Sequence, residues 1–554
     1  MFHTAGKLKN LVCIILLNFS IFNGFSSERA GQDLVLPGSW VYDALRSIEM
    51  EMARVTFSDQ APISIDELKY YLTQIDYERL SAPGKKQYER IEEYIHEKNF
   101  SFDAGIFSIG IEPSVNPEFY FKTSDSSIPW IYDYTQRQAL LSVPVQVRVG
   151  DYLSLYMGFA AMQMYTLRFS SDNYFNQIFT EGAFDGVLTH ENYLSAGYMW
   201  DNGVGLNLRF GTGTQSLGQT MMPGIIISEH FTDAPFINLR VFSPIFNYDL
   251  NVTQLTRESF FYSHRLEFLF FKKLELSFME GVVPHSQFDL RFIDPFGIYH
   301  GYGMFGEFRE FNSFFGAKIS FSPCQYLRLY GLYAQNEHTM ASENSGDPEG
   351  MGFQLGTVSS IPCGNGYIHA GLEMYYATPY LYIKNSPNVS FAKVFNELCA
   401  CPHYYEWLGN PLGPDTIAFQ VNLGYEVPEV YSVDLAYNFA AKGEFAGDRI
   451  FKDVSWEKNG NFDSDKWIYK SPDRNLTAPH GKIEYVNSIY AKGTWYTTPW
   501  LTLMLTTGYT FVFNSEHDMG KTNHGFEISL STRIDLTKIS KKRYSTDFLF
   551  TDNK

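Results

Sequence analysis

The chain has 554 residues, a formal net charge of −18 and an aromatic content of 17%. This acidic balance excludes nucleic acid and anionic lipid headgroups as its main partners, because both carry negative charge. The mean hydropathy is only −0.20, and beyond the N-terminus no run reaches the roughly 18 apolar residues of a membrane helix. Apolar residues alternate with polar ones instead, which is typical of a transmembrane β-barrel.

Residues 1–27 are predicted to be a secretory signal peptide. Two lysines precede an apolar core at residues 11–22, and small residues follow before Glu28, which is the order of an export signal. An N-terminal anchor helix is the alternative, but the run is short and Asn18 interrupts it. A lipoprotein is disfavoured because Cys13 lies inside the apolar core.

Residues 33–100 are predicted to form a small helical bundle. In "SWVYDALRSIEMEMARV" the apolar residues recur at helical spacing. Ser64 and Glu67 are placed as a capping box, and a third helix starts at about Pro83. Three short amphipathic helices need a partner surface for their apolar faces. We therefore expect this bundle on the periplasmic side of a barrel or as its plug.

Residues 101–538 are predicted to form an antiparallel β-barrel, followed by a C-terminal tail at 539–554. In "VPVQVRVGDYLSLYMGF" (143–159) apolar residues alternate with polar ones on both sides of a Gly-Asp turn, which is the period of a strand hairpin. The valines are expected to face lipid, so Gln146 and Arg148 face the lumen. A secreted soluble β-protein is the alternative, since alternation does not say whether the apolar face meets lipid or protein.

Turn spacing predicts the size of the barrel. The connections alternate between short turns and long, often acidic loops, as they do in outer-membrane barrels. With an opening strand before residue 124 and a closing strand at 524–535, the short turns predict about eighteen strands. These turns lie near residues 150, 202, 245, 272, 324, 364, 428 and 498.

Charged residues on the polar face of the strands are expected to organise the lumen and to bind the helical bundle through charge-assisted hydrogen bonds. They are Arg148, Arg209, His264, Arg265 and Glu267. Glu280 would lie on the same face of its strand as Phe278, which is expected to face lipid. We therefore predict either a bulge at Glu280 or the end of the strand before it. Cys324 and Cys363 follow prolines at successive short turns, and we predict a disulfide between them.

Three segments carry a resemblance to a known family. "PGSWVYDALRSIEM" (37–50), "LRFGTGTQSLGQTMMPGIII" (208–227) and "SHRLEFLFFKKLELSFMEGVVPHSQFDLRFIDPF" (263–296) resemble the capsule-assembly Wzi proteins. The resemblance implies an eighteen-stranded outer-membrane barrel, blocked at its periplasmic end by a helical bundle, with extracellular loops that bind glycan. The family's Trp-Gly-Pro-Gly pattern reads Phe-Gly-Thr-Gly here, with Gly211 and Gly213 as its glycines. These two glycines either let the backbone approach a ligand or mark a strand end.

The loop at 448–475 is the first candidate for a glycan site, because aromatic rings stack on sugars while carboxylates and amides bind hydroxyls. Its candidate residues are Trp456, Asn461, Asp463, Trp467 and Tyr469. Interfacial aromatics and a solvated acidic loop are the alternatives, and a calcium loop is disfavoured because the downstream bidentate Glu is missing.

The sequence has no nucleophile or metal-ligand motif, so we expect no enzyme, no cofactor and no metal. The predicted function is an outer-membrane barrel of a diderm bacterium that binds or organises surface polysaccharide. Its expected partners are outer-membrane lipid, that polysaccharide and the outer-membrane assembly machinery. A porin and an adhesin are the alternatives.

Overall fold

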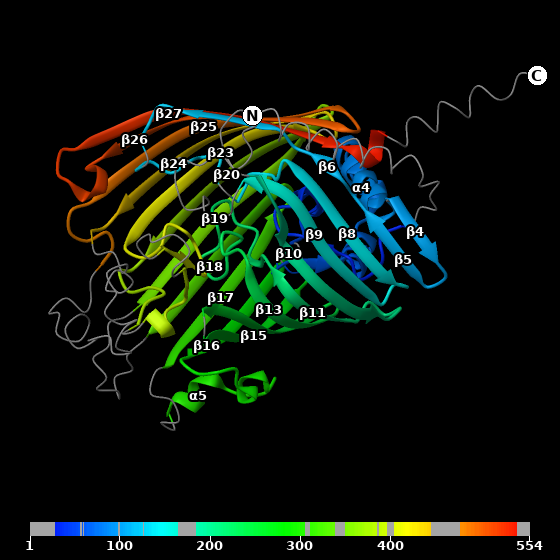
Figure 1. The fold of residues 1–554 in the computed structure, drawn as a ribbon, viewed down its shortest axis with the longest axis horizontal. Helices are drawn as coiled ribbons and strands as arrows, with labels where there is room; N and C mark the ends of the chain where they lie inside the picture. The colour runs from blue at the N-terminus through cyan, green and yellow to red at the C-terminus, as the bar shows by residue number, and fades with distance from the viewer. Residues whose placement is uncertain are drawn as a thin grey trace, which may run out of the picture.

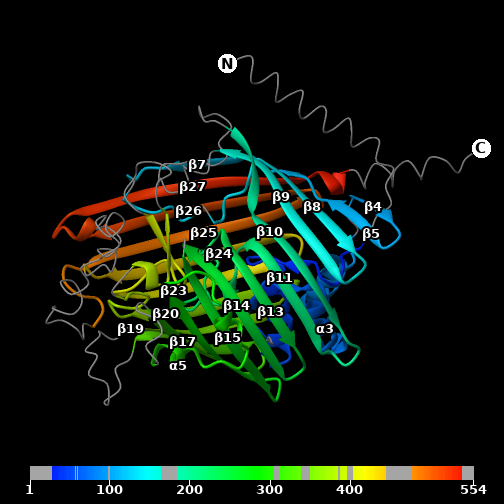
Figure 2. The same ribbon diagram turned by 60° about the horizontal axis from the view of Figure 1, so that its bottom comes forward.

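The wall of the molecule is a closed antiparallel barrel (Figures 1 and 2). Strands β5, β6 and β7 follow one another between β8 and β27, so together they act as a single interrupted strand. With that strand counted once, the barrel has 18 strands, which confirms the predicted fold class and number. The computed structural model describes residues 28–55, 58, 60–97, 100–125, 127–133, 135–163, 184–256, 258–304, 311–337, 350–384, 387–395, 404–444 and 477–539.

The strands of the wall run from β5 to β27, and a short strand, β4 (Phe100–Ala104), extends β5 on its other edge. Their bounds are β5 (Phe107–Ile111), β6 (Ser114–Val115), β7 (Glu118–Lys122), β8 (Leu141–Val149), β9 (Leu153–Gln163), β10 (Phe184–Met199), β11 (Gly205–Gly213), β13 (Ala234–Phe242), β14 (Phe246–Thr256), β15 (Ser259–Phe270), β16 (Leu274–Pro284), β17 (Phe311–Cys324), β18 (Leu327–Glu337), β19 (Gly350–Cys363), β20 (Gly366–Ala377), β23 (Thr416–Val427), β24 (Tyr431–Lys442), β25 (Glu484–Thr498), β26 (Leu501–Phe513) and β27 (Thr522–Asp535).

Each short turn expected from the sequence joins two neighbouring strands of the wall. The side-chain alternation also follows the expected parity. Along β8, Gln146 and Arg148 are buried inside, while the valines between them are only half-buried. Leu423 and Ile319 are among the apolar side chains that the wall exposes on its outer surface. The exterior is therefore apolar over many strands, as lipid requires.

Three helices precede the wall: α2 (Trp40–Glu51), α3 (Ile65–Thr73) and α4 (Ala82–Ile95). A 3-10 turn, η1 (Tyr77–Arg79), and the two-residue strands β1 (Leu34–Val35), β2 (Gln60–Ala61) and β3 (Ile63–Ser64) connect them. Each helix starts after a serine whose hydroxyl accepts a backbone N–H of the first turn. Within the described residues, no helix combines the length and the apolar character needed to cross a membrane.

Residues 28–97, which we call the helical segment, fill one end of the barrel (Figure 1). Their apolar faces form a separate core that includes Leu45, Leu68 and Ile91. The backbone joins this segment to the short turns, because Val55 donates to the carbonyl of Lys272 and Tyr326 donates to that of Met50. The end closed by the helices is therefore the end of the short turns.

Loops from the opposite end fold into the lumen and form the largest apolar core. Residues 214–233, between β11 and β13, meet residues 378–415, between β20 and β23. The first loop contains β12 (Ser216–Leu217), which pairs with β2 of the helical segment. The second holds the described hairpin β21 (Ala392–Phe395) and β22 (Tyr404–Trp407). Contact between loop and helical segment thus occurs inside the barrel.

Candidate functional site

Arginines of the wall bind the helical segment near the short turns. The guanidinium of Arg148 donates to both carboxylate oxygens of Asp33, with an Nε–Oδ1 distance of 3.2 Å and an Nη2–Oδ2 distance of 2.8 Å. Arg209 donates to the backbone carbonyl of Pro62. These side chains lie inside the barrel, and each spans from a strand to the helical segment.

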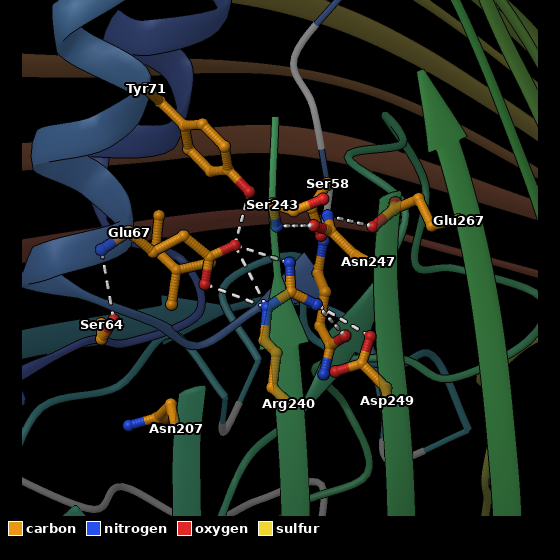
Figure 3. Close-up of polar contacts among 12 residues, drawn as sticks. Ser58, Ser64, Glu67, Tyr71, Asn207, Arg240, Ser243, Asn247, Asp249 and Glu267 are labelled. Atoms are coloured by element: carbon orange, nitrogen blue, oxygen red, sulfur yellow. Dashed lines mark hydrogen bonds and ion pairs between the residues drawn. The ribbon is translucent and has the colours of Figure 1, made fainter. Parts of the chain in front are cut away.

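A second group of contacts centres on Arg240 of β13 (Figure 3). Its guanidinium binds Glu67 of α3 through Nε and Nη2, with Nε–Oε2 at 2.9 Å and Nη2–Oε1 at 2.5 Å, and Nη1 lies 2.8 Å from Asp249 Oδ2. Arg240 and Glu67 are fully buried. A buried ion pair holds only where further hydrogen bonds satisfy its atoms, and Tyr71 supplies one by donating to Glu67.

The predicted capping box at the start of α3 forms only in part. The hydroxyl of Ser64 accepts the N–H of Glu67, as expected. The carboxylate of Glu67, however, binds Arg240. The Glu67 carboxylate pairs with Arg240 because this arginine projects into the lumen directly beside α3.

Arg265 and Glu267 of β15 extend this network along the wall. Arg265 donates to Asp249 at 2.8 Å and to Glu267 at 3.2 Å. It also reaches Gln60 of the helical segment at 2.5 Å. Asn247 donates to the second oxygen of Glu267 at 2.9 Å. The two arginines thus share Asp249, so the network contains alternating charges across three strands.

The part that Arg240, Glu67 and Asp249 play in the lumen network was not found from the sequence. Arg240 lies in "FINLRVF", where it alternates with outward apolar residues just as Arg209 does in β11. Parity alone could therefore have placed Arg240 in the lumen. Its partner could not be found in this way, because Glu67 is 173 residues away in the chain.

The lumen position predicted for His264 is wrong, because its side chain lies on the outer wall. His264 alternates with the inward Arg265 and pairs across the sheet with Glu280. The distance from His264 Nε2 to Glu280 Oε2 is 3.0 Å. The register through Glu280 is continuous, so neither the bulge nor the early strand end that we expected there occurs. Instead, a loop covers this pair from outside.

Farther from the short turns, glutamates of the wall bind the inward loops. Glu373 of β20 accepts the backbone N–H of Met221 at 2.7 Å and that of Met222 at 2.9 Å. Gln354 and Tyr330 also donate to Glu373. Glu373 is fully buried, so its carboxylate orders the loop backbone inside the barrel.

The same arrangement recurs on two other strands. Glu527 of β27 accepts the backbone N–H groups of Ile131 and Tyr132 at 2.8 and 2.9 Å. Glu191 of β10 accepts that of Thr214 at 2.8 Å. Carboxylates suit this role because each presents two oxygens with several lone pairs. The loops are therefore fastened to the wall through their backbones.

Two inward loops are also joined to each other by Asp133 and His230, at an Oδ2–Nε2 distance of 3.1 Å. Burial lowers the pKa of His230, but the hydrogen bond and charge of Asp133 outweigh burial, and the net pKa is raised. Burial raises the pKa of Asp133, but His230 and Thr135 outweigh it, and the net pKa is lowered. Both shifts favour the charged pair.

Gly211 and Gly213 lie within β11, where neighbouring groups come very close. A Cβ on Gly211 would meet the carbonyl oxygen of Asn192 at 2.2 Å, and one on Gly213 would meet the Glu191 carboxylate at 2.5 Å. Gly213 is the last residue of β11, whereas Gly211 still pairs with Tyr193 and Phe236 of the two neighbouring strands. The close neighbours are groups of β10, which is consistent with glycine at both positions.

The predicted disulfide does not form, because Cys324 and Cys363 are free, exposed thiols. Cys324 ends β17 and Cys363 ends β19, so the whole of β18 lies between them. Two strand spacings amount to about 10 Å, whereas bridged cysteines need a Cα separation below about 7 Å. The two turns follow one another along the sheet, but they lie too far apart for a disulfide.

The glycan candidates Trp456, Asn461, Asp463, Trp467 and Tyr469 lie outside the described residues, as does the predicted signal peptide at 1–27. Over the part of the chain that is described, no cluster of histidine, cysteine and acidic side chains has a geometry that could hold a metal ion. The described site is a lumen into which the helical segment and the inward loops are bound by side chains of the wall.

No protein-family model matches the chain, and no curated protein matches it in sequence. Among solved structures, the chain is similar to Wzi of Escherichia coli, an outer-membrane protein involved in group 1 capsule assembly and described as a carbohydrate-binding β-barrel. The identity is 13%, the TM-score is 0.59, and the match covers 91% of this chain and 99% of Wzi.

A more distant match is OprD of Pseudomonas aeruginosa, an outer-membrane protein, with a TM-score of 0.35 and 8% identity over 77% of this chain and 94% of OprD. The OmpT outer-membrane protein of Vibrio cholerae matches with a TM-score of 0.33 and 8% identity over 78% of this chain and 99% of OmpT. The match to Wzi covers 91% of this chain, and the chain has the Wzi fold that its sequence resemblance predicted.

Proposed function

We propose that this chain is a non-enzymatic outer-membrane barrel that binds or organises surface polysaccharide, and that its lumen does not serve as a pore. The observation that carries the proposal is the closure of the lumen from both ends. The helical segment is held at one end by Arg148, Arg209 and Arg240, and inward loops are held farther along the lumen by Glu373 and Glu527.

A barrel with a filled lumen offers its extracellular loops as its main functional surface. The fold match to a carbohydrate-binding barrel supports a glycan as the ligand. The loop at 448–475 remains our first candidate for the contact, because Trp456 and Trp467 would supply aromatic faces and Asp463 a hydroxyl acceptor. Location in the outer membrane is part of the same proposal.

Conductance measurements test the closed lumen. We expect the full chain, reconstituted in planar bilayers, to show no large, steady openings, because both ends of the lumen are occupied by bound segments. Large steady openings of the unmodified protein would contradict the proposal and favour a porin. Fractionation with the outer membrane, together with heat-modifiable gel mobility, tests the location.

Glycan binding is tested with the double variant Trp456→Ala, Trp467→Ala. If each stacking contact contributes about 1 kcal/mol, the affinity for purified polysaccharide of the host cell should fall by roughly 30-fold. Trp200→Ala is the matched control, because Trp200 is an exposed tryptophan near a short turn at the opposite end. Unchanged affinity of a correctly assembled double variant would exclude this loop.

A further inference from the structure

The connection between β16 and β17 does not fold into the lumen but lies against the outside of the wall. Residues 285–304, which we call the outer-wall segment, contain η3 (Leu290–Ile293) and α5 (Tyr299–Met304). In Figure 1, α5 lies beside the ends of β15 and β16, outside the barrel wall. It packs against β16 and β17.

Outward-facing residues of the wall form a core with this segment. Tyr262 and Val282 alternate with inward residues on β15 and β16, yet both are fully buried. Phe292 and Tyr299 of the segment cover them, and the rings of Tyr262 and Phe292 lie 5.0 Å apart. This apolar core is therefore separate from the lumen core and lies on the lipid side of the sheet.

The same segment shields the His264–Glu280 pair. The ring of Tyr299 stacks on His264 at 4.6 Å, and the backbone N–H of His300 donates to Glu280 at 2.8 Å. Polar side chains on a lipid-facing wall are costly unless they are paired and covered. The outer-wall segment both covers this pair and adds a hydrogen bond to it.

The position of Glu280 indicates the depth of the segment. Glu280 lies six residues beyond the start of β16 at Leu274. With a rise of about 3.3 Å per residue and a tilt of about 40°, that is roughly 15 Å above the short-turn end. The apolar band of such a barrel is about 25 Å tall, so the segment reaches membrane depth.

Several backbone N–H groups of the segment have hydrogen-bond partners within the protein. Asp289 donates its N–H to the hydroxyl of Tyr262, and Phe296 donates to the carboxylate of Asp294. The N–H groups of Phe292, Asp294, Gly297 and Gly301 bind carbonyls within the segment. Irregular backbone can lie in a low-dielectric environment only when its polar groups are paired in this way.

The exposed surface of the segment combines large apolar side chains with polar ones, since His285, Gln287, Arg291, Asp294 and His300 are exposed as well. Phe296 is 91% exposed, Leu290 74% and Ile298 72%. These side chains continue the apolar exterior of the neighbouring strands, where Phe278 and Phe315 are also exposed. Large apolar side chains grouped in this way indicate an interaction surface, and the exposed Arg291 is paired with Asp289 at 2.6 Å.

From these observations, we propose that the outer-wall segment is immersed in the outer leaflet, with Phe296, Leu290 and Ile298 contacting lipid acyl chains. The inference is independent of glycan binding. It assigns this connection a role in seating the barrel in its membrane, unlike the connections that fill the lumen.

Photo-crosslinking in intact outer membranes tests the proposal. The photoreactive amino acid p-benzoylphenylalanine replaces Phe296 in one variant and Ile298 in a second. Crosslinking at each position is thus measured in a separate protein. Leu423, exposed on the wall in β23, is the lipid-facing control. Met519, exposed in the connection between β26 and β27, is the water-facing control.

We expect lipid adducts at positions 296 and 298 to an extent comparable with position 423, and none at 519. Adducts between two copies of the chain would overturn the proposal and identify the patch as a protein interface. A pattern like that of position 519, with no lipid adduct while position 423 reacts, would overturn it by placing the segment in water. Heat-modifiable mobility of each variant verifies assembly.

Discussion

At the short-turn end of the lumen, arginines of the wall meet carboxylates and carbonyls of the helical segment, whereas farther along the strands glutamates of the wall hold backbone amides of the loops. Arg240 with Glu67 represents the first arrangement, and Glu373 with Met221 the second. The Arg240–Glu67 contact depends on a charged side chain from each partner. The second needs a specific side chain only on the wall, because every loop residue except proline carries an amide.

This difference predicts unequal sensitivity to substitution. Loss of one partner from a buried ion pair leaves a charge in a low-dielectric interior, which costs more than a lost neutral hydrogen bond. The helical segment should therefore be released more readily by a single substitution than a loop should. Three measurements compare the two closures.

The largest effect is expected for Arg240→Ala. It leaves the buried carboxylate of Glu67 without its cation, while Asp249 retains Arg265. We expect docking of the helical segment to lose about 3–5 kcal/mol, measured as faster hydrogen exchange in α3 and as new channel openings. The double variant Arg240→Met, Glu67→Gln should recover much of the closure, because no buried charge is then left unpaired. Wild-type exchange in α3 of Arg240→Ala would refute the importance of this pair.

A smaller effect is expected for Glu373→Ala, which removes the acceptor of the Met221 and Met222 amides. The local cost should be about 1–3 kcal/mol, seen as faster exchange at these two amides with no change in α3. Glu373→Gln is the matched control, since it keeps an acceptor oxygen and should lie between wild type and Glu373→Ala. Equal acceleration in α3 would show that the two closures are not separate.

The smallest effect concerns the Asp133–His230 link between loops. The pKa of His230 is raised, so its stabilisation is present at lower pH and is lost as pH rises through that raised value. The pKa of Asp133 is lowered, so its stabilisation is lost as pH falls through that lowered value. Between the two values the link should contribute about 1 kcal/mol, measured as slower exchange of nearby loop amides. His230→Asn should abolish this pH dependence.

The sequence by itself determined the wall of the barrel. The strands, the short turns and the 18-strand total follow from alternation with a period of two and from turn residues, both of which are local properties. Parity also placed Arg148, Arg209 and Arg265 inside. The same rule would have placed His264 outside, but we grouped it with its charged neighbours instead.

Only the tertiary structure decided which groups meet. Glu67 binds Arg240 across 173 residues, and Glu373 binds Met221 across 152. Closure of the sheet sets these distances, and no local pattern records them. The same reason explains Cys324 and Cys363, whose turns follow each other in sequence yet stand two strand spacings apart. Nor does alternation say whether a connection enters the lumen or lies along the outer wall, because both choices bury apolar side chains against one face of the same sheet.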